Sequence, residues 1–146
     1  MKKLFIVLTM CAVFFVSGCQ KNAKDNDGPG IVETKKESEI VVTCSSWSGW
    51  SSDYKPTEET FTYTVEEGVV VKPDNKNTVG QFEFKIINVT SDSITIKTNE
   101  AMSCKDVGDS GINLNSKEDT FEIKKGEKIQ LTTLTMDCGD IYIIGY

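Results

Sequence analysis

From residue 40 onward, apolar and polar residues alternate in short runs, which is the pattern of half-buried β-strands. Phe61, Tyr63 and Val65, for example, are separated by threonines. Turn-forming clusters such as Glu66-Glu67-Gly68 recur at intervals of about ten residues. The same alternation is found in the runs 82–86, 94–98, 112–114, 121–123 and 129–136. No stretch has the 3.6-residue periodicity of a helix, so the pattern predicts an all-β domain.

The pattern predicts about eight or nine short, closely spaced strands between residues 40 and 146. This content predicts an antiparallel β-sandwich of the immunoglobulin-like kind, with a small β-barrel as the alternative. The alternation changes phase between Leu131 and Leu134, which indicates a bulge or a crossing between sheets near Thr132-Thr133.

The N-terminus follows a different pattern. Two lysines precede an apolar-rich run from Leu4 to Val16, as in the first two regions of a secretory signal. The run is shorter than the roughly 20 apolar residues that a membrane-spanning helix needs. It ends in Val16-Ser17-Gly18-Cys19, which resembles the lipobox of bacterial lipoproteins. An ordinary cleaved signal is the alternative.

The resemblance implies cleavage after Gly18 and attachment of lipid, including palmitate, to the sulfur and amino group of Cys19. Each buried CH₂ contributes ~0.8 kcal/mol, so two or three acyl chains give a stable anchor. The expected organisation is a signal peptide over 1–18, a lipidated flexible tether over 19–39 and a single β-sandwich domain over 40–146.

The polar tether contains a Lys- and Asp-rich tract at residues 21–27. This tract resembles the signal that sends some Gram-negative lipoproteins to the outer face of the outer membrane. A plain polar spacer is an equal alternative. The expected location is the cell envelope, and the outer membrane if the cell is Gram-negative.

Composition excludes several functions. Removal of residues 1–18 takes away two of 16 cations and none of 22 acids, which leaves a net charge of −8. An acidic surface repels phosphate backbones, so we expect no nucleic-acid partner. The chain has no His, which excludes Ser-His-Asp and Cys-His catalysis and His-ligated zinc within one chain. We expect a protein that is not an enzyme and has no cofactor.

Three cysteines other than Cys19 remain in the mature chain, so at most one internal disulfide forms. Cys104 and Cys138 lie in turn-like stretches that could meet at one end of a sandwich, and we predict that they pair. Cys44 is then a small buried apolar residue. The other pairings and a fully reduced chain stay open.

Aromatic residues provide the main candidate for ligand binding. Trp47 and Trp50 are three residues apart and Tyr54 follows closely. If one strand continued through both tryptophans, their rings would point to opposite faces. An exposed Trp/Tyr patch suits the apolar face of a sugar ring. The simpler interpretation is that one ring closes the end of the sandwich and the other is half-exposed.

Acidic residues flank the two cysteines that we predict to pair. A bridge would bring their carboxylates together, and they could bind Ca²⁺ with backbone carbonyls. Solvated turn acids are the simpler interpretation, and hydrolysis of glycosides by paired carboxylates is a remote alternative. The residues concerned are Asp106, Asp109, Asp137 and Asp140.

These observations favour a non-catalytic, membrane-anchored lipoprotein whose β-sandwich is a binding or structural module of the cell envelope. The expected partners are the membrane, through lipid on Cys19, and a protein or a glycan. A carbohydrate-binding module that uses Trp47, Trp50 and Tyr54 is the alternative function.

Overall fold

A computed structural model describes residues 38–76, 78 and 80–146. Signal peptide, Cys19 and nearly all of the tether lie outside the described residues. The described chain forms strands and no helix, and therefore contains no helix long and apolar enough to span a membrane. The strands are β1 (Glu39–Ser48), β2 (Glu59–Thr64), β3 (Val70–Val71), β4 (Phe84–Val89), β5 (Ser93–Thr98), β6 (Ser103–Lys105), β7 (Thr120–Lys124), β8 (Lys128–Thr132) and β9 (Cys138–Gly145).

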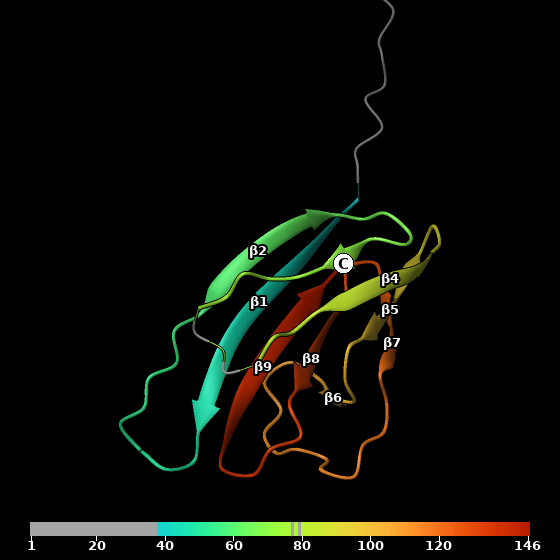
Figure 1. Cartoon of the computed structure of the whole chain (residues 1–146). Helices are drawn as coiled ribbons and strands as arrows, with labels where there is room; N and C mark the ends of the chain where they lie inside the picture. The colour runs from blue at the N-terminus through green and yellow to red at the C-terminus, as the bar shows by residue number, and fades with distance from the viewer. Residues whose placement is uncertain (1–37, 77, 79) are drawn as a thin grey trace, which may run out of the picture. The chain divides into compact units, whose positions relative to one another are not determined.

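The strands form two antiparallel sheets (Figure 1). The five-stranded sheet has the order β2-β1-β9-β8-β6, and the four-stranded sheet has the order β3-β4-β5-β7. Strand β9 lies in the middle of the five-stranded sheet, between β1 and β8. The prediction of an all-β, antiparallel sandwich with this number of strands is confirmed.

The core lies between the sheets and is built by alternate residues of each strand. In β1, Ile40, Val42 and Cys44 are fully buried, whereas the residues between them belong to the outer face. Tyr142 of β9 stacks on Phe82, with ring centroids 3.8 Å apart. Burying each large apolar side chain contributes roughly 1.5–3 kcal/mol. This alternation fixes the register, since a slip of one residue would expose the whole apolar set.

Two segments that the sequence predicts as strands are loops. Strand β8 ends at Thr132, and the chain leaves the sheet until β9 begins at Cys138. The change of phase near Thr132-Thr133 therefore marks the end of a strand, not a bulge within one. Residues 112–114 lie in the loop between β6 and β7 because the backbone of Asn113 bonds to a side chain, not to a neighbouring strand.

The predicted pairing of Cys104 with Cys138 is wrong, because both are free, exposed thiols. Cys104 lies opposite Leu131 of β8, which lies opposite Tyr142 of β9, four residues from Cys138. Two strand spacings and four residues of rise separate the Cα atoms by about 16 Å, and a disulfide needs less than about 7 Å. Cys44 is buried as predicted, and burial raises the pKa of its thiol to about 11.

Candidate functional site

The outer faces of the two sheets differ in charge. Exposed Lys85, Lys97, Glu122 and Lys124 cover the four-stranded sheet and are solvated. On the five-stranded sheet, the outer-face side chains of β1 from Val41 to Trp47 are uncharged, as are those of β9. An uncharged strip therefore runs along the middle of the five-stranded sheet.

A buried glutamine of β8 fastens the β6–β7 loop over this strip. Gln130 is on the outer face, beside Ile143 of β9. The amide N–H of Gly108 donates to its Oε1 at 3.1 Å, and its Nε2 donates to the carbonyl of Asp109 at 3.2 Å. Both ends of one side chain are thus bonded to the loop backbone, and the loop lies across the outer face.

Two side chains of β6 hold the same loop farther along. The hydroxyl of Ser103 accepts a hydrogen bond from the backbone N–H of Asn113 at 2.9 Å. The ammonium group of Lys105 donates to the carbonyl of Ser110 at 2.8 Å. The loop therefore has a defined position above the sheet although it contains no strand.

A groove of about 400 Å³ lies between this loop and the loop that connects β8 to β9. Its floor is the outer face of the five-stranded sheet, and its walls are the two loops. We call it the outer-face groove. Its main lining residues are Trp47, Thr132 and Ile141 on the sheet, Ile112 and Leu114 on the β6–β7 loop, and Met136 on the β8–β9 loop.

Trp47 occupies one end of the groove because the residue opposite it is glycine. Trp47 of β1 faces Gly139 of β9 across the sheet. A Cβ atom at position 139 would lie 2.9 Å from the indole Nε1 and would collide with the hydroxyls of Thr133 and Thr135. The missing side chain lets the indole close over β9, as aromatic residues do over glycine in sheets. The indole Nε1 is buried and has no hydrogen-bond partner among the described residues.

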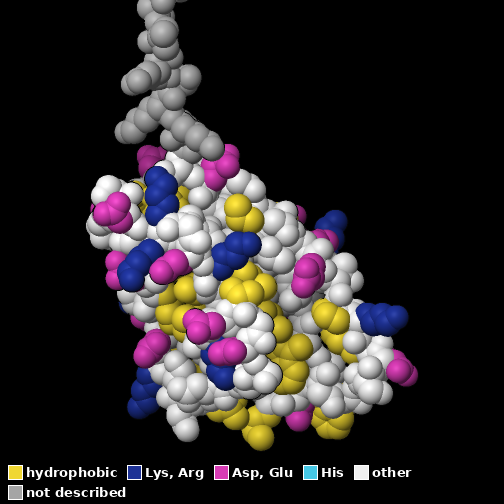
Figure 2. Space-filling view, turned by 180° about the vertical axis from the view of Figure 1, so that it is seen from behind, with side chains coloured by type: hydrophobic (Ala, Val, Ile, Leu, Met, Phe, Trp, Pro, Cys, Tyr) yellow, Lys and Arg dark blue, Asp and Glu magenta, His cyan; other side chains and the backbone are white. Residues whose placement is uncertain are grey.

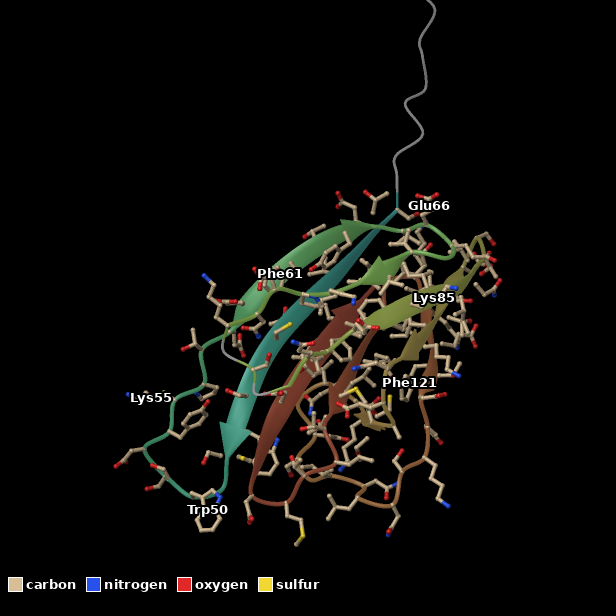
Figure 3. The ribbon with its side chains drawn as sticks, viewed as in Figure 1. Trp50, Lys55, Phe61, Glu66, Lys85 and Phe121 are labelled. Atoms are coloured by element: carbon tan, nitrogen blue, oxygen red, sulfur yellow. The ribbon has the colours of Figure 1, made fainter. Side chains whose placement is uncertain are left out.

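The three predicted aromatics differ in their surroundings. Trp50 follows the end of β1 and is 78 % exposed (Figure 3). Tyr54 is 43 % exposed, and its hydroxyl hydrogen-bonds to that of Ser46, which has the parity of the inner face. Only Trp47 lines the groove. Trp47 has the parity of the outer face of β1 and does not close the end of the sandwich, and Trp50 is more exposed than the half-exposed ring that the sequence predicts. Ligand binding by all three aromatics stays a prediction.

The four aspartates proposed for Ca²⁺ also remain apart. Asp140 is 1 % exposed, and its Oδ2 accepts hydrogen bonds from the backbone N–H of Gly80 at 3.0 Å and from the hydroxyl of Tyr142 at 3.3 Å. Burial raises the pKa of the Tyr142 hydroxyl, and the Asp140 carboxylate raises it further. The other three aspartates are exposed. In residues 38–76, 78 and 80–146, no three His, Cys, Asp or Glu side chains gather as metal ligands, since the disulfide expected to join them is missing.

Sequence reasoning missed most of the groove. Ile112, Leu114 and Met136 alternate with polar residues, and that alternation indicated buried strands. The Gly- and Ser-rich stretch before Ile112 is the signal that could have marked these apolar residues as part of a loop.

Scans against protein-family models, curated proteins and solved structures find no match to this chain. The interpretation of the site therefore depends on its geometry.

Replacing Gln130 by Leu removes the bonds to Gly108 and Asp109 with little change in volume. The released backbone groups then lose partners near the sheet, so we expect a loss of about 1–2 kcal/mol in the free energy of unfolding. Amide hydrogen exchange should become at least about tenfold faster at residues 107–111. Gln81→Leu, at an exposed glutamine, is the matched control and should change neither quantity. Unchanged exchange in the loop of Gln130→Leu would show that Gln130 does not hold it.

Proposed function

We propose that this chain is a non-catalytic bacterial lipoprotein of the cell envelope, anchored through Cys19, and that its β-sandwich binds a protein partner in the outer-face groove. The lipobox-like residues Val16-Ser17-Gly18-Cys19 support the anchor. The absence of His from the chain supports a non-catalytic role. The groove is the observation that carries the binding function.

Exposed apolar side chains surround the groove. Met136 is 77 % exposed and Leu114 is 43 % exposed, and both line it. The backbone N–H of Gly49 donates to the carbonyl of Asp137 at 2.7 Å, which places the loop containing Trp50 beside the loop containing Met136. Figure 2 shows hydrophobic side chains protruding at this lower end of the molecule. Clustered exposed apolar residues mark interaction sites in soluble domains.

The lining favours a protein over a sugar. Its apolar residues are mostly aliphatic, and Met adapts its shape to apolar partners. A sugar ring stacks on an aromatic face with hydrogen-bonding groups around it, and only one aromatic residue, Trp47, lines the groove. Carbohydrate binding is the second candidate function, because Asp109 and Thr135 line the same groove as Trp47 and offer oxygen atoms to hydroxyl groups.

The groove lies far from the point where the tether joins the domain. Strand β1 begins at Glu39, the last residue of the expected tether, and Trp47 is near the other end of the strand. Ten residues of strand extend about 33 Å. A domain anchored through Cys19 would therefore present the groove at the end opposite its attachment, where a partner has access.

Replacing Cys19 by Ser removes the thiol that would receive the diacylglycerol. We expect the protein to lose its palmitate label and to move from the membrane fraction to the soluble fraction of the cell. Cys138→Ser, at an exposed thiol, is the control and should stay labelled and membrane-bound. A membrane-bound Cys19→Ser protein would contradict the anchor.

A photoreactive benzoylphenylalanine at position 136 tests the groove in intact cells. Illumination should yield one discrete adduct with an envelope protein, detected by its shift in a denaturing gel. The same group at Val70, an exposed apolar residue of the four-stranded sheet, should yield none. Gln130→Leu should weaken the adduct because it loosens the groove wall. No adduct at position 136, or an equal adduct at position 70, would contradict binding in the groove.

A further inference from the structure

We infer that the outer-face groove takes an extended peptide segment that inserts a large apolar side chain and carries Lys or Arg on both sides of it. This inference rests on the proposed function, since it specifies the chemistry of the partner that binds there. It combines two properties of the groove, its apolar floor and the acidic residues at its rim.

The floor and walls accept an apolar side chain. Ile141 provides an aliphatic surface on the sheet, and Ile112 and Leu114 face it from the loop. A volume of about 400 Å³ lies within the usual range for ligand pockets, about 300–1,000 Å³. Gln130 already uses its oxygen and one of its N–H donors on the loop backbone, which leaves fewer of its hydrogen-bonding positions for a polar ligand. The buried surface thus favours an apolar group.

The rim is acidic. Asp109 is the charged residue among those that line the groove, and exposed Asp137, which does not line it, directly follows Met136 of the opposite wall. Lys105 of the adjoining strand donates to a loop carbonyl beside Gly111, so its charge offsets part of the negative charge on this wall. The net charge of −8 that remains after removal of residues 1–18 attracts cations at longer range. Lys or Arg on both sides of the apolar side chain would complement both walls.

The charge also argues against the groove of a second copy of this chain as the occupant. A copy brings the same acidic rim and the same net charge, so two grooves repel each other when they approach. A cationic segment is attracted both by the acidic residues at the rim and by the net negative charge of the domain. Charge complementarity therefore selects the occupant that the apolar floor alone leaves open.

The test uses the full lipidated chain in zwitterionic nanodiscs with Trp50→Phe, which leaves Trp47 as the single tryptophan. The probes are three short synthetic peptides. The first has a central Leu-Phe pair flanked by lysines, the second has glutamates in place of the lysines, and the third has Ser-Gly in place of Leu-Phe. We expect a saturable change in Trp47 fluorescence with the first peptide, with affinity at least about tenfold above the other two and weakened by added salt.

Matched acidic variants locate the charge effect. Asp109→Asn should weaken binding of the lysine peptide several-fold. Asp92→Asn, at an exposed acid of the turn between β4 and β5, changes net charge equally and should leave the affinity unchanged. Equal losses in the two variants would mean that net charge alone attracts the peptide, and would overturn the inference.

The outcomes separate this inference from the proposed function. Equal affinity for the lysine and glutamate peptides overturns the inference, while a photoadduct at Met136 in cells would keep the binding function. If no peptide binds and no adduct forms, both fail. Saturable binding of a neutral oligosaccharide, in the absence of peptide binding, replaces the protein partner with a glycan and also overturns the inference.

Discussion

The double hydrogen bond of Gln130 to the β6–β7 loop is the constraint on which the proposed binding surface depends. A buried amide must satisfy both its donor and its acceptor. Gln130 does so with the N–H of Gly108 and the carbonyl of Asp109. The same two bonds also satisfy backbone groups of the loop, which need hydrogen-bond partners because the loop lies on an apolar sheet. The loop can therefore carry Ile112 and Leu114 as a wall above the sheet.

A second local constraint completes the groove from the other side. Gly139 removes a side chain near the start of the central strand β9, and Trp47 closes over the space. The outer face of the four-stranded sheet carries exposed lysines and acids, with an ion pair between Lys97 and Asp119 at 3.2 Å. One sandwich thus has a solvated, charged face and a face whose middle strands are uncharged, and the proposed function belongs to the second.

Much of the fold could be predicted from the sequence, because alternation directly reports which side of a strand is buried. For example, the alternation of Phe61 and Tyr63, and of Ile94 and Ile96, with polar residues shows which face of each strand points into the core. The groove could not be predicted, since alternation at Ile112 and Leu114 has the same form in a strand and in a loop that covers a sheet. The predicted disulfide between Cys104 and Cys138 was wrong because turn-like composition does not specify the order of strands in a sheet. The sequence predicted Trp47 as a candidate site residue. Its neighbours in the groove could not be predicted, because the pairing of strands brings them together and the spacing of residues along the sequence does not specify that pairing.

The central claim is that the outer face of the five-stranded sheet binds a peptide and the outer face of the four-stranded sheet does not. Methyl-resolved NMR of the full chain in nanodiscs, titrated with the lysine-flanked Leu-Phe peptide, tests it most directly. The account predicts shifts of the methyl signals of Ile112, Leu114 and Met136, with those of Val70 and Ile87 unchanged. Shifts confined to Val70 and Ile87, or no shift at saturating peptide, would contradict it.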